Sequence, residues 1–173
     1  DNFAAHPHRT KKLLQRIIRE NLHIRFSAQV RCDAARDKEL LDLFQSAGCH
    51  LVLVGFESIN DETLKAYRKG KQSLARIEYA IDEFHKRSIM IHGMFVIGAD
   101  TDTPGTAIQT AQWAADQGIG SLQMLPLCPL PGTEILSQLE KHNRIFKTSN
   151  SILKEFIPYG AGNTFLDFRR QQF

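Results

Sequence analysis

The sequence has no apolar run long enough to form a membrane-spanning helix. The longest apolar stretches, such as residues 51–56, stop far short of the roughly 20 residues that a span requires. Composition also excludes a disordered or fibrous class, because hydrophobic residues make up 42% of the 173-residue chain and charged residues 24%. One globular domain with a sizeable core is therefore predicted.

Cysteine is scarce and poorly spaced for cross-links or metal ligation. Cys32, Cys49 and Cys128 are odd in number and none lies in a CxxC pair, so neither a disulfide framework nor a closed metal site is encoded. Free thiols are expected, although Cys32 and Cys128 both follow predicted strands and a ligand role for them stays open. Reduced thiols favour a cytoplasmic protein. The chain starts at Asp1 with no signal-like segment, and we expect further sequence upstream of it.

A strong excess of one charge is also missing. The net charge is +3 and the pI about 8.8, with lysine and arginine interleaved with aspartate and glutamate along predicted helices. This pattern favours solvated helix faces over a nucleic-acid interface. Of the seven histidines, only His6 and His8 lie close together, which is a poor metal-ligand pattern. The GxGxxG, Walker and GxSxG motifs are absent.

Four strands are predicted, each preceded by an amphipathic helix. They are "HIRFSAQV" (23–30), "HLVLVGFE" (50–57), "MIHGMFVIG" (90–98) and "SLQMLPL" (121–127). Their spacing is that of a strand plus a crossover helix, so a parallel sheet of βα units is expected.

The preceding helices show apolar stripes at helical spacing, and two of them end before a glycine. Gly48 and Gly118 stand where a helix C-cap requires a left-handed residue. The stripes predicted to face the sheet are Leu14, Ile17 and Ile18; Leu40, Phe44 and Ala47; Leu74, Ile77, Ile81 and Phe84; and Ile108, Ala111 and Ala115.

A series of βα units forms either a barrel or an open doubly wound sheet, and in both the loops after the strands carry ligands. These loops read "RCDAARD", "ESINDET", "ADTDTPGT" and "CPLPGTE". The repeat is lost from about residue 142, where "NTFLDF" is predicted to add one more strand. We therefore expect a core at 1–141 and an extension at 142–173 that packs on it.

Polar residues at the strand ends are the candidate ligand contacts. Alternation places Gln29 and Arg31 on one face, and Leu53, Gly55 and Glu57 on one face. Two interpretations of Glu57 stay open: a carboxylate that accepts hydrogen bonds from a sugar diol, or an acid that caps a helix or lies in a loop. Arg31 and Asp33 form either a ligand contact or a simple rim ion pair.

Gly93 removes a side chain from the interior of the third predicted strand. Such a glycine marks the close approach of a ligand or of another backbone segment.

Five segments together resemble the radical SAM superfamily, in particular its cobalamin-associated branch of hopanoid and bacteriochlorophyll biosynthesis. They are "DNFAAHPHRTKKLLQRII", "SAQVRCDAARDKELLDLFQSAGC", "VGFESINDETLKAYRKGKQ", "HGMFVIGADTDT" and "PLCPLPGTEI". The resemblance implies a partial, incomplete TIM-like barrel with about four to five parallel strands of a (β/α)6 core. It also implies S-adenosylmethionine and a 4Fe–4S cluster as cofactors of the parent enzyme, with cobalamin a further possibility, and a 5′-deoxyadenosyl radical that attacks a small-molecule substrate.

The resemblance further implies which residues meet S-adenosylmethionine. Asn2 is expected to contact the methionyl amino group, Glu57 the ribose hydroxyls and Lys69 the methionyl carboxylate. Residues expected to lie near the cofactor or against its adenine are Gln29, Arg31, Gly93, Val96, Ile97, Gly98, Leu125 and Leu127.

One feature of the family is missing from this sequence. The CxxxCxxC motif that ligates the cluster is absent, and the three cysteines present do not replace it. We therefore expect a C-terminal fragment that is inactive alone and binds no cofactor. We also expect its exposed sheet edges to favour a homodimer.

Two further functions stay open from the residues alone. One is a βα module that binds adenosine or a partner without radical chemistry. The other is a metal-dependent barrel hydrolase, which would need histidines at the rim of the sheet.

Overall fold

Alternating helices and strands build the first part of the chain, as the βα repeat predicts. A computed structural model describes residues 2–67, 72–147 and 164–166. By contacts the chain divides into two compact units, Asp1–Leu125 and Pro126–Phe173. This division falls one helix before the expected boundary at residue 141. The packing of residues 142–173 on the core stays a prediction.

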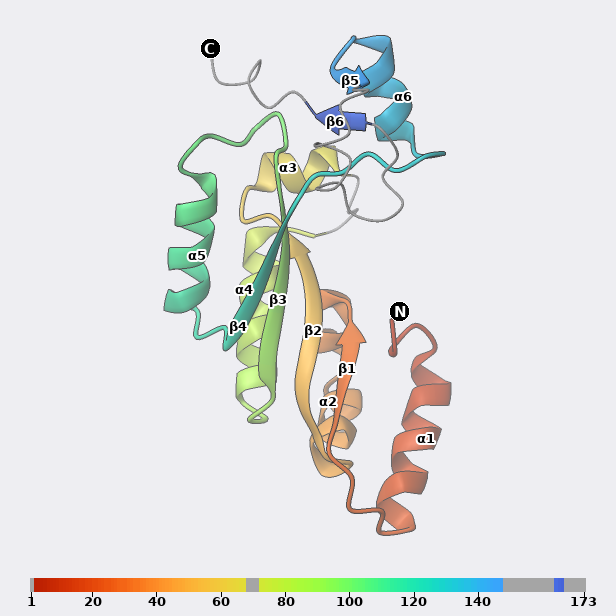
Figure 1. The fold of residues 1–173 in the computed structure, drawn as a ribbon. Coiled ribbons are helices and arrows are strands. Elements are labelled where there is room, and N and C mark those ends of the chain that lie inside the picture. The colour runs from red at the N-terminus through yellow and green to blue at the C-terminus, as the bar shows by residue number, and fades with distance from the viewer. Residues whose placement is uncertain (1, 68–71, 148–163, 167–173) are drawn as a thin grey trace. The chain divides into compact units, whose positions relative to one another are not determined.

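The first unit contains a four-stranded sheet in the order β1-β2-β3-β4 (Figure 1). Strands β1 and β2 are parallel, as are β2 and β3, so the predicted parallel sheet is confirmed. Its elements are α1 (Pro7–Arg19), β1 (Phe26–Val30), a 3₁₀ helix η1 (Cys32–Arg36), α2 (Lys38–Ser46), β2 (Cys49–Glu57), α3 (Asp61–Ala66), α4 (Leu74–His85), β3 (Met90–Ile97), α5 (Thr106–Asp116) and β4 (Ser121–Pro126).

Side chains that alternate along the strands separate two faces of the sheet. One face is buried and carries aromatic rings: Phe56 of β2 lies 5.7 Å from Phe95 of β3, which lies 6.3 Å from Trp113 of α5, between ring centroids. On the other face Gln29 is exposed and Glu57 half-buried. The core therefore lies between the sheet and its helices. The second face, which carries Gln29 and Glu57, is not filled by this core.

Three of the predicted helix stripes need correction in part. In α5 the buried residues are Thr106, Thr110 and Ala114, while Ile108 is 75% exposed. The helix is turned relative to the prediction because Trp113 packs on the core through Phe95. The predicted stripe of α2 is buried, and that of α4 is buried except for the half-buried Leu74. In α1, Leu14 is buried whereas Ile18 is exposed.

The helix ends follow the local chemistry of the sequence. Asp37 accepts a hydrogen bond from the Leu40 N–H at the start of α2, and Asn60 caps α3 in the same way. Gly48 and Gly118 have φ of +93° and +69°, which confirms both as C-terminal caps.

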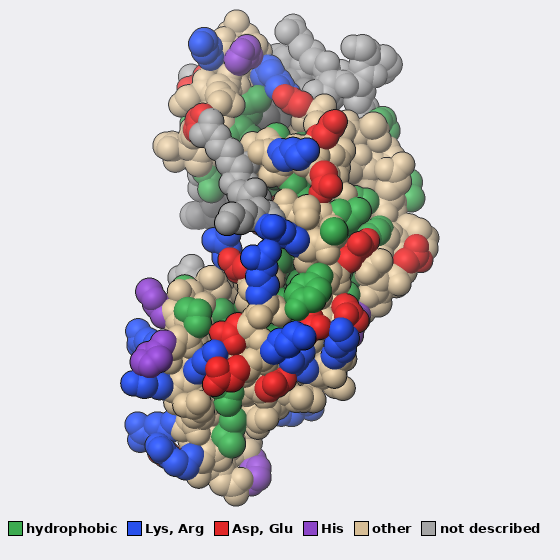
Figure 2. Space-filling view, turned by 180° about the vertical axis from the view of Figure 1, so that it is seen from behind, with side chains coloured by type: hydrophobic (Ala, Val, Ile, Leu, Met, Phe, Trp, Pro, Cys, Tyr) green, Lys and Arg blue, Asp and Glu red, His purple; other side chains and the backbone are tan. Residues whose placement is uncertain are grey.

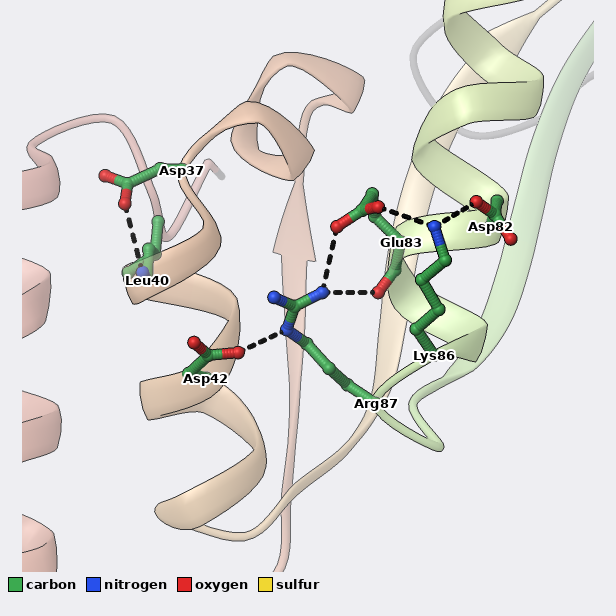
Figure 3. A network of polar contacts seen from close by, with 7 residues as sticks. All are labelled: Asp37, Leu40, Asp42, Asp82, Glu83, Lys86 and Arg87. Atoms are coloured by element: carbon green, nitrogen blue, oxygen red, sulfur yellow. Dashed lines mark hydrogen bonds and ion pairs between the residues drawn. The ribbon is translucent and has the colours of Figure 1, made fainter.

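An ion-pair network joins the outer helices. Arg87, after α4, bonds to Asp42 of α2 at 2.6 Å and to Glu83 of α4 at 3.0 Å, and Lys86 bonds to Glu83 at 2.9 Å (Figure 3). Acidic and basic side chains are interspersed over this side of the molecule (Figure 2).

The second unit holds α6 (Glu134–Lys141), β5 (Ile145–Lys147) and β6 (Thr164–Leu166). Thr133 caps α6, as the turn-rich "CPLPGTE" suggests. Strand β6 falls within "NTFLDF" and pairs antiparallel with β5 instead of extending the parallel sheet.

Candidate functional site

A cavity of about 1050 Å³ opens where the strands of the first unit end, which is the edge where open and closed βα sheets bind ligands. This volume suits a cofactor-sized molecule. The lining combines apolar and polar side chains: Asn2, Gln29, Val30, Arg31, Cys32, Asp33, Arg36, Gly55, Glu57, Gln72, Ala75, Arg76, Tyr79, Met94, Phe95, Val96, Gln123 and Leu125.

Residues 2–3 complete the cavity on the β1 side. The Phe3 N–H donates to the carbonyl of Gln29 at 2.8 Å, so this segment runs beside the end of β1. The Asn2 Oδ1 accepts from the Ala4 N–H at 3.1 Å, which fixes the side chain of Asn2 at the cavity.

Glu57 ends β2 in an irregular conformation. In the register with β3, Gly55 pairs with Met94 and Glu57 with Phe95, so Phe56 is an extra residue in a bulge. Glu57 itself has φ of +69°, a region that residues with a side chain adopt at a cost. Bulges and positive φ values of this kind are common beside functional sites.

Gly55 provides the space for the Glu57 carboxylate. A Cβ at position 55 would lie 2.6 Å from Glu57 Oε1. The carboxylate therefore folds back over Gly55, on the cavity side of β2.

A second polar group lies in the electrostatic field of Glu57. The Tyr67 hydroxyl is buried and has no hydrogen-bond partner in the part of the chain that the structure describes. Burial first, and then the negative charges of Asp102, Glu57 and Asp100, raise the pKa of Tyr67 to about 12. The hydroxyl thus stays protonated and is able to donate a hydrogen bond at neutral pH.

Of the residues that the resemblance selects, six line this one cavity: Asn2, Gln29, Arg31, Glu57, Val96 and Leu125. Gly93, Ile97 and Gly98 do not line it, and Leu127 belongs to the second unit. Lys69 lies outside the described residues.

Gly93 faces the buried side of the sheet. A Cβ there would lie 3.0 Å from the Phe95 ring and 3.2 Å from the Phe56 ring. Aromatic rings, rather than a ligand or a backbone segment, therefore occupy the space that this glycine leaves. Gly98 has φ of +111°, and its N–H donates to Asp102 Oδ2 at 2.7 Å, so it forms the turn after β3.

Arg31 keeps both of its sequence interpretations. It lines the cavity and also lies 3.8 Å from Asp33, with both side chains about two-thirds exposed. An exposed pair at this distance contributes little to stability.

Sequence reasoning selected neither Gly55 nor Gln72 as a site residue. Gly55 shares a face with Glu57 in the predicted alternation, so the signal for it was present. Gln72 carries no periodic signal, and only its spatial neighbours identify it.

A cluster or metal ion does not fit the described residues. Cys32 is half-buried at the cavity, Cys49 is buried and Cys128 is exposed in the other unit. Burial raises the pKa of the Cys49 thiol to about 11, which disfavours the thiolate that metals bind. Within the described ranges no group of three or more His, Cys, Asp or Glu side chains is placed to hold a metal.

The cavity does fit a nucleoside. Glu57 offers a carboxylate to hydroxyl donors, Gln29 and Gln123 offer amides, and Val96 and Leu125 offer apolar surface.

A match to a known protein family identifies the family of the chain. The sequence model of the Radical SAM superfamily matches residues 1–114. The chain belongs to the radical SAM superfamily. The match ends within α5 and covers β1, β2 and β3 together with most residues that line the cavity.

Two curated relatives place the chain in the branch that the motifs indicate. It is 29% identical over 146 residues to bacteriochlorophyllide d C-12(1)-methyltransferase of Chlorobaculum tepidum, covering 84% of this chain and 32% of the relative. It is 26% identical over 154 residues to hopanoid C-2 methylase of Rhodopseudomonas palustris, covering 87% and 29%. The chain therefore spans about a third of the length of these relatives.

A solved structure shows the same fold. The radical S-adenosylmethionine methyltransferase TsrM of Kitasatospora setae, with cobalamin and a [4Fe-4S] cluster bound, superposes with a TM-score of 0.72 at 18% identity, over 99% of this chain and 36% of TsrM. The likeness confirms the predicted incomplete radical SAM barrel. Among the described helices, none is long and apolar enough to cross a bilayer.

Proposed function

We propose that residues 2–125 form the S-adenosylmethionine-binding part of a radical SAM enzyme that methylates or oxidatively modifies a small-molecule substrate. The observation that carries the proposal is the placement of Glu57: a carboxylate at the bulged end of β2, folded over Gly55 into a cavity of about 1050 Å³. The names of the relatives, two methyltransferases and an anaerobic magnesium-protoporphyrin IX monomethyl ester cyclase, support this range of reactions.

The residues of the cavity divide the work of binding. Glu57 accepts hydrogen bonds from the two ribose hydroxyls, Asn2 meets the methionyl amino group, and Gln29 and Arg31 lie near the cofactor. Val96 and Leu125 pack on the adenine, which keeps water from that side of the nucleoside. In the whole enzyme, bound S-adenosylmethionine, reduced by one electron from the 4Fe–4S cluster, would supply the 5′-deoxyadenosyl radical that takes hydrogen from substrate in this superfamily.

The 4Fe–4S cluster and cobalamin of the whole enzyme require residues other than those described. The 173-residue chain alone should therefore produce no 5′-deoxyadenosine, since its described residues offer no set of cluster ligands. The free thiols are consistent with a cytoplasmic enzyme. The outer strands β1 and β4 remain the proposed edges for homodimerisation, although the Phe3 N–H already occupies part of the β1 edge.

The test is binding of S-adenosylmethionine to the full-length protein, measured by calorimetry. Glu57→Ala should weaken binding by about 1–3 kcal/mol, because the ribose hydroxyls lose their acceptor. Glu62→Ala, a matched change on the exposed start of α3, should leave the affinity unchanged. Equal affinities of the Glu57→Ala variant and the unchanged protein would reduce Glu57 to a structural residue.

Anaerobic reconstitution of the full-length protein tests the chemistry. It should yield 5′-deoxyadenosine, whereas binding without this product would favour the alternative of an adenosine-binding module.

A further inference from the structure

We propose that Gln72 is a positioning residue, which holds the bulged end of β2 so that the Glu57 carboxylate stays aimed into the cavity. The inference rests on the proposed function only in taking Glu57 as the ligand-binding carboxylate. Gln72 ends the segment "VGFESINDETLKAYRKGKQ", but the resemblance assigns it no role; its contacts do.

The end of β2 needs an external restraint. Phe56 is an extra residue in the ladder with β3, so the backbone around it loses the regular pairing of a strand. Glu57 follows at φ of +69°, which a residue with a Cβ does not adopt readily. Without further bonds, this segment would relax toward a regular strand and turn Glu57 away from its present position.

The Gln72 amide supplies such bonds from outside the strand. Its Nε2 donates to the carbonyl of Gly55 at 3.3 Å and to the carbonyl of Phe56 at 3.1 Å. These are the two carbonyls directly before Glu57, and a primary amide carries the two N–H groups needed to serve both. A third contact, 3.7 Å to Cys32 Sγ, joins the amide to the residue after β1.

The position of Gln72 is itself fixed by its neighbours. The N–H of Leu74, two residues on, donates to Asp61 Oδ1 of α3 at 2.8 Å. The Ser58 N–H donates to the same Phe56 carbonyl at 2.9 Å, so both sides of the bulge are restrained. Gln72 thus links the start of α4 to the end of β2.

The link reaches the carboxylate through Gly55. A Cβ on Gly55 would lie 2.6 Å from Glu57 Oε1, so the carboxylate occupies the space over Gly55, the residue whose carbonyl accepts a hydrogen bond from Gln72. We therefore expect a shift of the Gly55 backbone to move the carboxylate. Gln72 also lines the cavity, but the bonds of its Nε2 run to the backbone of β2, and the proposed role acts through Glu57.

A double-mutant cycle on the full-length protein tests this role, with calorimetric titration of S-adenosylmethionine as the readout. Gln72→Met keeps the length of the side chain but removes the donor, and it should raise the Kd about 5- to 10-fold when Glu57 is present. In the Glu57→Ala background the same change should have no effect. Equal weakening in both backgrounds would overturn the proposal, because Gln72 would then act on the ligand or on the fold as a whole.

Hydrogen exchange gives a readout that does not depend on the ligand. The Gln72→Met change should speed exchange of the Glu57 and Ser58 amides and leave those of β1 unchanged. Unchanged exchange at these two amides would also overturn the proposal. If Gln72→Met fails to fold, Gln72→Asn, which keeps the amide one methylene closer to the backbone, should give a smaller change in the same direction.

The two proposals fail in different ways. If Glu57→Ala binds S-adenosylmethionine normally while exchange still responds to Gln72→Met, the assignment of Glu57 is lost and the restraint on β2 stands. If Glu57→Ala weakens binding but Gln72→Met changes neither affinity nor exchange, the assignment of Glu57 stands and the role of Gln72 is lost.

Discussion

Two glycines in neighbouring strands have opposite surroundings. Gly93 in β3 lies on the helix-covered face, where a Cβ would lie 3.0 Å from the Phe95 ring. Gly55 in β2 lies on the cavity face, where a Cβ would lie 2.6 Å from Glu57 Oε1. The first glycine makes room for core packing and the second for a carboxylate. A glycine that leaves space for a close neighbour can therefore serve either stability or binding, and the face of the sheet decides which.

The comparison predicts that stability and affinity respond separately to changes on the two faces. Rings in the core are held by neighbours on all sides and yield little, whereas a carboxylate at the end of a flexible side chain can swing away. Changes on the helix-covered face should lower the free energy of unfolding. Changes on the cavity face should lower the affinity for S-adenosylmethionine.

The largest expected effect on stability comes from the buried face. Phe84 of α4 has no exposed surface. Phe84→Ala should lower the free energy of unfolding by about 3–5 kcal/mol, because it leaves a cavity in the core. Urea unfolding followed by circular dichroism measures the loss. The affinity of the molecules that remain folded should not change, and a loss of both together would break the separation of the faces.

Gly93→Ala should have the next largest effect. The added methyl would press on the Phe95 and Phe56 rings, and overpacking of this kind costs about 1–3 kcal/mol. The urea midpoint should fall, while S-adenosylmethionine binding stays within error of the unchanged protein. Weaker binding without loss of stability would show that Gly93 does face the cofactor.

Gly55→Ala is the matched change on the other face. The carboxylate of Glu57 has to leave its place over residue 55, so the Kd for S-adenosylmethionine should rise about 10-fold, or about 1.4 kcal/mol. The free energy of unfolding should change by less than about 1 kcal/mol, since a side-chain end moves more easily than a packed ring. If Gly55→Ala destabilises the fold as much as Gly93→Ala, the two glycines have the same role.

The sequence predicts the sheet well because its signals are local. Strand β2, predicted at 50–57, spans Cys49–Glu57, and Gly48 and Gly118 end their helices as expected. The errors arise where neighbours decide. Trp113 turns α5 so that Thr110 is buried and Ile108 exposed, although the pattern of apolar residues suggests the reverse.

In the candidate site, too, some residues follow from local sequence signals and others only from the fold. Alternation along β2 places Glu57 and Gly55 on one face before any coordinates are known. The role of Gln72 depends on two carbonyls that are distant in sequence, 16 and 17 residues away, and on a bulge that no local pattern announces. Side-chain to backbone bonds of this kind are visible only in three dimensions.

The smallest expected effect lies on the outer helices, away from both glycines. The hydrogen bond from Lys86, together with that from Arg87, lowers the pKa of Glu83 against the opposing effect of burial (Figure 3). A carboxyl whose pKa is lower in the folded protein stabilises the fold above its unfolded pKa of about 4.5, and this stabilisation is lost as the pH falls through the folded value. The urea midpoint should therefore drop between about pH 5 and pH 3.

Replacing the lysine should flatten that acid response. Lys86→Met removes the main cause of the lowered Glu83 pKa, so the urea midpoint should depend less on pH below about 5 than in the unchanged protein. Lys65→Met, on the exposed surface of α3, is the matched control and should keep the full acid response. Neither change should affect S-adenosylmethionine binding, because neither residue lines the cavity. An identical acid response in all three proteins would show that the hydrogen bond from Lys86 does not lower the pKa of Glu83, and that this pair contributes nothing to the acid dependence.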